Sequence, residues 1–125
     1  MNYLYVGMGG FIGSVLRYTI GLIMNNDTLT FPFATLTVNL LGSFFLSFLV
    51  FTIFRKVNIS TNIQVALTAG LLGSFTTFSA VSVETISLLE NGEFLFACLY
   101  LLITISGGMG MAFLGYLFKK KVVGP

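Results

Sequence analysis

Four long apolar runs constrain the fold of this chain more than any other feature. They extend over residues 3–24, 31–54, 63–89 and 94–118 and take up nearly the whole of its 125 residues. An α-helix needs about 20 predominantly apolar residues to cross the roughly 30 Å of bilayer hydrocarbon. Because only 8% of the residues are charged, the chain has too little polar surface for a soluble domain. We therefore expect an all-α membrane protein, a single domain over residues 1–125 with four transmembrane helices.

Residue types that carry out catalysis are scarce. The sequence contains no histidine and a single cysteine, Cys98. The absence of histidine removes the usual proton shuttle, the usual zinc ligand and the base of the common nucleophilic triads. One cysteine cannot form a disulfide within the chain, and a net charge of +2 offers nucleic acid little to bind. We therefore expect neither an enzyme nor a nucleic-acid-binding protein.

The distribution of charge predicts the orientation. Four spans place both termini and the connection between the second and third spans on one side of the membrane. That side carries Arg55, Lys56 and Lys119–Lys121, whereas the loops of the other side carry only acidic residues, which are Asp27, Glu90 and Glu93. Cytoplasmic loops are enriched in Lys and Arg, so we expect a multi-pass cell-membrane protein with both termini in the cytoplasm. In this interpretation Lys119–Lys121 are a stop signal at the membrane surface.

Glycines and hydroxyls interrupt the third apolar run. Residues 70–82 read GLLGSFTTFSAVS. Inside hydrocarbon, non-helical backbone is tolerated only where protein buries it or where it lines a polar path. Half-helix amino termini and unwound carbonyls bind ions in transporters, so this segment is a candidate ion or solute site at a helix break. The alternative is close helix packing by small residues in an unbroken helix.

Small residues recur at a four-residue spacing that favours close helix packing. The members are Gly9 with Gly13, Ser43 with Ser47, Ala66 with Gly70 and Ser74, and Gly108 with Ala112. Four short helices mostly fill the space between themselves, so we expect an oligomer. At least half of these motifs are expected to pack helices within one subunit. The third and fourth spans hold the best candidates for contacts between subunits.

Asn39 lies near the middle of the second run, and Thr35 lies one turn away on the same helical face. An anion in the bilayer must exchange its water shell for hydrogen-bond donors, and a carboxamide with nearby hydroxyls supplies them without a trapping charge. The alternative for Asn39 is a hydrogen bond between helices that serves packing.

Two further residues of the third run have open roles. The ring edge of Phe78 carries the positive end of the aromatic quadrupole and can face an anion, although a lipid-facing position is the commoner role of phenylalanine. Glu84 is a carboxylate within a span, which is costly and usually functional. It either reaches the outer interface or pairs with Arg17.

Three motifs resemble those of the CrcB/Fluc family of fluoride channels. They read GGFIGSVLRY over residues 9–18, TLTVNLLGSF over residues 35–44 and GLLGSFTTFS over residues 70–79. Their order and their placement on the four runs extend the resemblance over nearly the whole chain. The resemblance implies an antiparallel dimer of four-helix subunits with an interrupted third helix. It also implies two fluoride pores along the subunit boundary and a buried structural Na⁺ on the central axis.

The resemblance also implies roles for individual residues. Asn39 resembles the pore amide of the family, and Phe78 resembles its first pore phenylalanine. Arg17 resembles the vestibule arginine. The polar track of the fourth helix corresponds to Tyr100 and Thr104. Backbone carbonyls of Gly73 and Thr76 correspond to the Na⁺ ligands, and Glu84 stands where the family pattern has a glutamate.

Two positions depart from the family pattern. Val81 stands where the family has a second pore phenylalanine, and Gly108 stands where the polar track usually continues with a hydroxyl. A homodimer of antiparallel subunits needs little charge bias between its two ends, whereas this chain has a strong one. We therefore expect one half of a heterodimer, whose partner is a paralogue with the opposite bias.

The function implied is passive export of F⁻ from the cytoplasm, driven by the membrane potential, which lowers fluoride toxicity. An alternative is a non-conducting subunit that completes its partner's pore. A proton-coupled exporter of the small multidrug type is a further alternative. It needs a titrating carboxylate at mid-depth, for which Glu84 is the only intramembrane candidate.

Overall fold

The computed structural model describes residues 2–124 and is helical apart from short connections. Its elements form four helices that are long and apolar enough to cross a membrane. The first is α1 (Asn2–Met24). The second joins α2 (Phe33–Phe48), η1 (Leu49–Ile53) and α3 (Phe54–Lys56). The third comprises α4 (Thr61–Val65), η2 (Ala66–Leu72), α5 (Gly73–Phe75) and α6 (Ser79–Glu90), and the fourth is α7 (Phe94–Val122).

The spans agree with the expected ones to within a few residues at each end. The second begins at Phe33 because Pro32 occupies the position before the first helical residue, where a missing N–H is tolerated. The fourth continues to Val122, so that the lysine cluster forms its last turns. Two segments, η1 and η2, are wound as π-helix, which the apolar pattern did not indicate.

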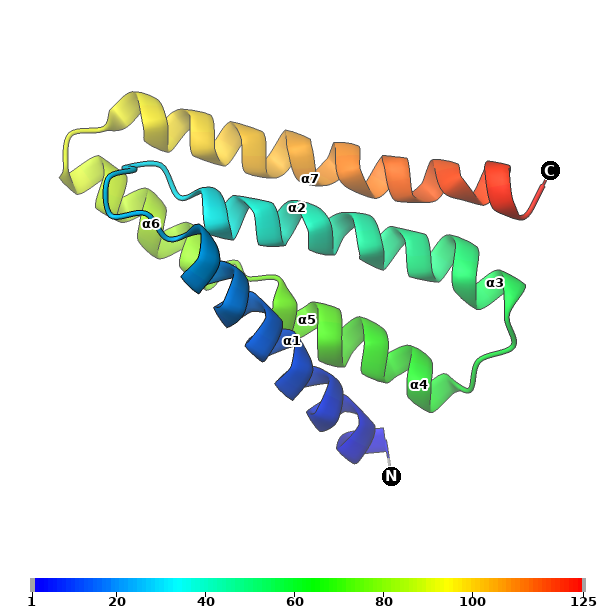
Figure 1. Cartoon of the computed structure of the whole chain (residues 1–125). Helices are drawn as coiled ribbons and strands as arrows, with labels where there is room; N and C mark the ends of the chain where they lie inside the picture. The colour runs from blue at the N-terminus through cyan, green and yellow to red at the C-terminus, as the bar shows by residue number, and fades with distance from the viewer. Residues whose placement is uncertain (1, 125) are drawn as a thin grey trace.

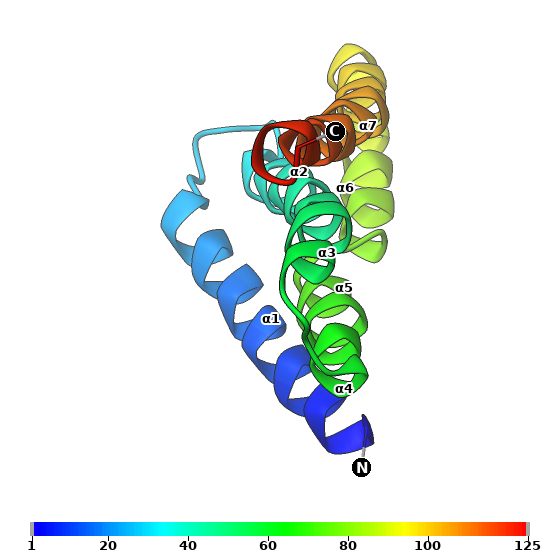
Figure 2. The same ribbon diagram turned by 90° about the vertical axis from the view of Figure 1, so that its right-hand side faces the viewer.

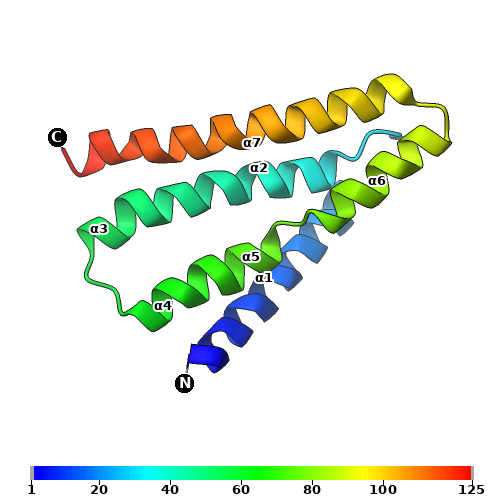
Figure 3. The ribbon, with the colours of Figure 1, turned by 180° about the vertical axis from the view of Figure 1, so that it is seen from behind.

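The helices form two packed pairs. Helix α2 packs along α7, and α1 packs along η2 and α5 (Figures 1 and 2). Helix α6 diverges from α5 after the break and packs against α7. Both chain ends and the α3–α4 connection lie at one end of the molecule, and the α1–α2 and α6–α7 connections lie at the other (Figures 1 and 3).

Glycines bring the backbones of both pairs into contact. A methyl group on Gly70 would lie 2.7 Å from the carbonyl oxygen of Val6, and one on Gly115 would lie 2.6 Å from that of Phe44. Methyl groups on Gly9 and Gly13 would overlap the carbonyl oxygens of Ala66 and Leu71, in that order.

Small-residue motifs of the first and third runs therefore pack helices within one subunit. Ser74 adds a hydrogen bond of 2.8 Å from its hydroxyl to the carbonyl of Gly10. We had expected Gly70 and Ser74 among the contacts between subunits, but they face α1. Gly108 faces α2, where a methyl group would lie 3.6 Å from Ser43 Oγ.

The buried core is small, and most large apolar side chains lie on the surface. One buried cluster joins α2, α6 and α7 through Leu36, Val81, Leu88, Ala97 and Tyr100. Another joins α2, η2 and α5 through Val38, Leu72 and Phe75. Phe11, Phe78 and Met109 are exposed by 72%, 84% and 72%. Such a surface requires lipid or another protein chain as its environment.

Candidate functional site

The third span is broken at Thr76–Phe78, as expected from its glycines and hydroxyls. Helix α5 ends at Phe75, and Thr76 has the extended conformation (φ −77°, ψ 156°). Helix α6 starts again at Ser79. The alternative of an unbroken, closely packed helix is therefore excluded for this segment.

Asn39 bonds to both backbone polar groups of Thr77, within the break. Its Nδ2 donates to the Thr77 carbonyl (2.9 Å), and its Oδ1 accepts from the Thr77 N–H (2.8 Å). The side chain thus takes the place of a neighbouring backbone and satisfies two groups that the break would leave unpaired. One N–H of the carboxamide remains for another acceptor. These two bonds are the kind of hydrogen bond between helices that the packing interpretation of Asn39 predicts. The remaining N–H is compatible with the other interpretation, in which Asn39 donates to an anion.

The break frees two carbonyls that were expected to bind Na⁺. In a continuous α-helix the Gly73 carbonyl would accept from the N–H of Thr77, and the Thr76 carbonyl from that of Ala80. The Thr77 N–H instead donates to Asn39, and the Ala80 N–H donates to Thr77 Oγ1 (3.2 Å). Both carbonyls therefore lose their helical partner. Such carbonyls are the hard oxygen donors that alkali cations bind at helix interruptions.

A cavity of about 530 Å³ adjoins the break, and we name it the break cavity. It brings together five of the expected site residues, which are Asn39, Gly73, Thr76, Phe78 and Thr104. Among the described residues, the buried hydroxyl of Thr104 has no hydrogen-bond partner. The ring of Phe78 is 84% exposed on this side of the subunit. The break cavity therefore combines unused donors with an aromatic ring at the subunit surface.

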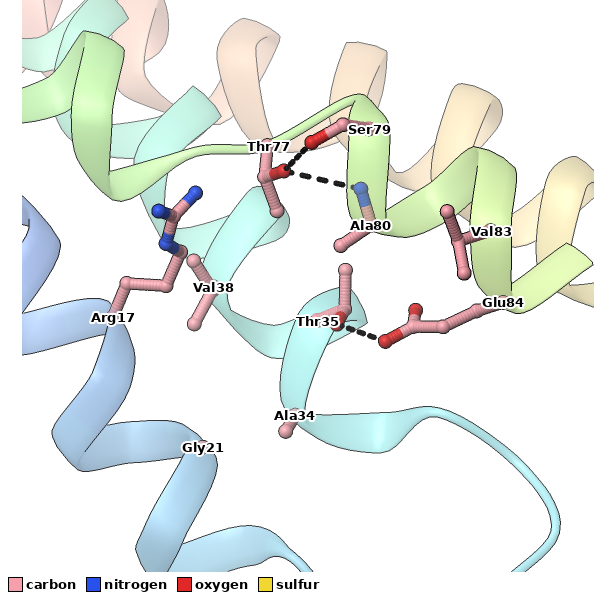
Figure 4. Close-up of a pocket in the computed structure, with 10 residues that line it drawn as sticks. All are labelled: Arg17, Gly21, Ala34, Thr35, Val38, Thr77, Ser79, Ala80, Val83 and Glu84. Carbon is pink, nitrogen blue, oxygen red and sulfur yellow. Dashed lines mark hydrogen bonds between the residues drawn. The ribbon is translucent and has the colours of Figure 1, made fainter.

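A second cavity of about 460 Å³ lies between α1, α2 and α6, and we name it the arginine cavity (Figure 4). Arg17 reaches it from α1, Thr35 from α2 and Glu84 from α6. Thr77 lines both cavities. The break thus lies between a cavity with a cationic side chain and one with neutral donors.

Glu84 binds two hydroxyls. Its Oε1 accepts from Thr35 Oγ1 (2.7 Å), and its Oε2 accepts from the Tyr100 hydroxyl (2.6 Å). Tyr100 is fully buried. We considered that Glu84 either reaches the outer interface or pairs with Arg17. Its two carboxylate oxygens instead bind these hydroxyls, although Arg17 lines the same cavity. Thr35, Glu84 and Tyr100 form one network that joins α2, α6 and α7.

Sequence reasoning missed two residues of this site. Thr77 contacts Asn39 and both cavities, and the paired threonines of the TTFS motif were the available signal. Gly42 is buried on α2, where a methyl group would overlap Cγ2 of Thr76. Gly42 lies one turn after Asn39 and therefore faces the same part of the third span, and this spacing was the available signal in the sequence.

Val81 and Gly108, the two residues that depart from the family pattern, both lie against α2. Val81 is 3% exposed and packs with Leu36 and Tyr100, although it also contributes to the wall of the break cavity. Gly108 lies against Ser43. Neither residue supplies a polar side chain or a ring to the cavity.

The fold and this site define a multi-pass helical membrane protein with freed carbonyls at an interrupted span and, beside it, cavities that polar side chains enter. Ion-conducting and transporting proteins have this arrangement. A family model described as CrcB-like protein, Camphor Resistance (CrcB), matches residues 4–116, and the chain belongs to this family.

Relatives from three bacteria support the assignment. The chain is 47% identical over 110 residues to Fluoride-specific ion channel FluC 1 of Desulfitobacterium hafniense (strain Y51), covering 88% of this chain and 96% of the relative. It is 45% identical over 123 residues to Fluoride-specific ion channel FluC of Chlorobium chlorochromatii (strain CaD3), covering 98% and 95%. It is 41% identical over 123 residues to Fluoride-specific ion channel FluC 2 of Listeria innocua, covering 98% and 94%.

Proposed function

We propose that this chain is a subunit of a fluoride-specific ion channel through which F⁻ leaves the cytoplasm passively. The observation that carries the proposal is the break cavity, where an unused N–H of Asn39 and the unpartnered hydroxyl of Thr104 lie beside Phe78. Relatives at 40–47% identity bear the name fluoride-specific ion channel, which identifies the anion. The chain is not an enzyme, and the exporter alternative has no support from these relatives.

The cavities suggest a route for the anion. An anion that comes from the basic, cytoplasmic end reaches the break cavity first, where neutral donors replace its water. The guanidinium of Arg17 then attracts F⁻ into the arginine cavity, which lies nearer the α1–α2 and α6–α7 connections. A neutral carboxamide and hydroxyl do not trap the ion, so it can leave again. The membrane potential contributes about 2.3 kcal/mol per 100 mV to the exit of one negative charge, so no coupled ion is needed.

The hydroxyls of Thr35 and Tyr100 have a different part in this route. Both protons are directed at Glu84, so each hydroxyl must turn away from the carboxylate before it can donate to an anion. Of the two residues, only Thr35 lines the arginine cavity, so its hydroxyl is the donor near the route while an acceptor occupies it. This arrangement favours anions that are strong acceptors, because a weak acceptor does not compete with a carboxylate.

The freed carbonyls support a structural Na⁺. Gly73 and Thr76 would hold the ion through backbone oxygens, and a dimer would bring two such pairs together. The ion would supply a fixed positive charge and would satisfy oxygens that the break leaves without a helical donor. The melting temperature of the purified dimer is expected to be higher in NaCl than in N-methylglucamine chloride of equal ionic strength, and an equal value would contradict the site.

An antiparallel dimer is the assembly that fits the exposed pore residues. Phe78 and Gly73 are exposed and line a cavity at the subunit surface, so a second subunit is needed to close the path. Five of the six cationic residues lie at one end of the molecule, which favours a single orientation with both termini in the cytoplasm. The partner is therefore a paralogue with the opposite charge bias, and the chain alone forms no working channel.

The test is fluoride efflux from liposomes, followed with a fluoride electrode after addition of valinomycin. Efflux that requires co-expression of the paralogue supports the heterodimer. Fluoride-selective efflux from this chain alone contradicts the heterodimer and leaves the channel function intact. Release of chloride as fast as fluoride, or no efflux with any paralogue, contradicts the channel function. Asn39→Ala in the active assembly separates pore flux from leakage.

A further inference from the structure

One end of the molecule carries an uncompensated positive charge. Arg55 and Lys56 end α3, and Lys119–Lys121 lie in the last turns of α7 at the same end (Figure 1). The acidic residues lie elsewhere: Asp27, Glu90 and Glu93 belong to the connections or helix end at the opposite side, and Glu84 binds Thr35 and Tyr100. Among residues 2–124, no acidic side chain therefore lies at this end to pair with these cations.

Two of these cations are held by a pair of aromatic rings. Phe51 of η1 and Tyr116 of α7 meet edge to face, with ring centroids 5.2 Å apart and an interplanar angle of 90°. The guanidinium carbon of Arg55 lies 5.9 Å from the centroid of Phe51. The Nζ of Lys119 lies 5.7 Å from the centroid of Tyr116. Because the two rings are in contact, the cation-binding rings of the second and fourth spans are neighbours.

Contact with the rings restricts the two long side chains before any ligand binds. A cation over an aromatic face is attracted by the ring quadrupole, and a restricted side chain loses less entropy when it binds an anion. Lys120 and Lys121 are exposed, and among residues 2–124 only Arg55 and Lys119 are placed over a ring. The pair is thus a preorganised anion site within a wider basic surface.

The surroundings of the site determine which anion fits. Helix α7 exposes large apolar side chains on the side of Tyr116: Phe113, which stacks with Tyr116, is exposed by 59%, and Met109, two turns before Tyr116, is exposed by 72%. A free inorganic anion gains nothing from these groups. A lipid places its phosphate at the level of the basic residues and its acyl chains along the apolar ones.

We propose that Arg55 and Lys119, braced by Phe51 and Tyr116, bind the phosphodiester headgroup of an anionic phospholipid in the adjoining leaflet. The site is separate from both cavities and is independent of the proposed fluoride function. It holds the ends of the second and fourth spans together through one shared ligand, and so links the assembly to the lipid composition of the membrane.

The experiment is native mass spectrometry of the full-length protein in a neutral detergent, titrated with phosphatidylglycerol and, separately, with phosphatidylcholine. Wild-type protein is expected to retain phosphatidylglycerol in preference to phosphatidylcholine. Arg55→Gln and Lys119→Gln are each expected to weaken phosphatidylglycerol binding at least about fivefold, the effect of one membrane-surface cation. Lys119→Arg keeps a cation above the ring and is expected to retain binding.

Lys120→Gln is the matched control, since it removes the same charge from the neighbouring position without a ring beneath it. It is expected to weaken binding less than Lys119→Gln does, because it removes only the general attraction of one surface cation and no contact with a ring. Tyr116→Leu keeps all five charges and is expected to weaken binding as Lys119→Gln does. Equal losses for Lys119→Gln and Lys120→Gln would overturn the site in favour of diffuse attraction, as would full binding by Tyr116→Leu.

Two further outcomes overturn the proposal. Equal retention of the two lipids means that the headgroup charge is not recognised. Displacement of phosphatidylglycerol by millimolar inorganic phosphate means that the site takes the free anion and that the apolar surface below it plays no part. The melting temperature of each variant in the same detergent provides the folding control, because the basic end lies outside both cavities.

Discussion

Asn39 shows how one polar side chain can stabilise a broken helix inside the membrane. Both of its functional atoms bind Thr77, so the two helical segments of the third span are tied to α2 at the point where they separate. The position of Asn39 identified it as a candidate from the sequence alone. Its bonds to Thr77 depend on how the second and third spans meet, which a linear pattern does not contain.

Replacing Asn39 by alanine should leave both backbone groups of Thr77 without a partner. We expect Asn39→Ala to lower the free energy of unfolding by about 2 kcal/mol and to reduce fluoride efflux sharply. Denaturant unfolding in detergent and liposome efflux measure the two effects. Ser43→Ala is the control, because the Ser43 hydroxyl bonds only back to the Asn39 carbonyl of its own helix, and it should change stability little. Equal stability of the two variants would contradict the role assigned to the Asn39 side chain.

Tyr100→Phe should remove one of the two hydroxyls that bind Glu84. The half-buried carboxylate then keeps only Thr35, and we expect a loss of about 1–3 kcal/mol in stability together with slower fluoride efflux. Tyr18→Phe removes a hydroxyl from a side chain that is 68% exposed and should have no measurable effect. If Tyr100→Phe matches Tyr18→Phe in thermal unfolding and efflux, the network does not support the pore.

At the scale of elements, the break in the third span depends on its packing against α2. Gly42 provides the space for Thr76, the first residue with extended backbone after α5. The extended residue and the missing side chain are 34 positions apart in the sequence, and the α2–α5 contact brings them together. The break is therefore a property of two spans and not of the third alone.

Gly42→Ala should displace the break, because the added methyl overlaps Cγ2 of Thr76. We expect a loss of about 1–3 kcal/mol in stability and reduced fluoride efflux. Adding Thr76→Ser removes Cγ2, keeps the hydroxyl that binds the Leu72 carbonyl, and should restore both properties. Gly110→Ala is the control, since nothing lies within 4 Å of its added methyl. Failure of Thr76→Ser to rescue Gly42→Ala would show that the steric contact is not the cause.

The four spans and the site of the break were predictable, because hydropathy and the glycine-hydroxyl segment over residues 70–82 report on local chemistry. The π-helical winding of η1 and η2 was not, since their residues, LVFTI and ALTAGLL, carry no pattern that separates a π-helix from an α-helix. The family resemblance identified residues that share a cavity. Their hydrogen-bond partners could not be predicted, because these partners depend on how the helices pack. Glu84 is the clearest case, since its partners come from α2 and α7.

At the scale of the whole molecule, the charges and the exposed pore face make opposite demands. Five cations at one end favour one orientation in the membrane. The antiparallel dimer that we propose instead requires a second, inverted subunit against the exposed Phe78. A partner with the reverse charge bias satisfies both demands. The orientation of this chain is therefore tested separately from its conduction.

Single cysteines introduced at Asn58 and Asn91 in a Cys98→Ser background should report that orientation. In intact cells, a membrane-impermeant maleimide is expected to label Asn91→Cys and to leave Asn58→Cys unlabelled, because Asn58 belongs to the basic end. Neutralising Arg55, Lys56 and Lys119–Lys121 with glutamine should make both positions accessible in part of the population. Labelling of both positions before neutralisation would contradict the single orientation.

The pairing of Asn39 with Thr77 makes the break a fixed joint and not a hinge. Helices α5 and α6 cannot swing about Thr77 without separating two hydrogen bonds in a region where water is scarce to replace them. In the channel that we propose, a path beside such a joint would have no gate at the break, so we expect its selectivity to come from the lining itself. The rate of ion passage should then rise with temperature only as gently as diffusion does, with no step from a gate.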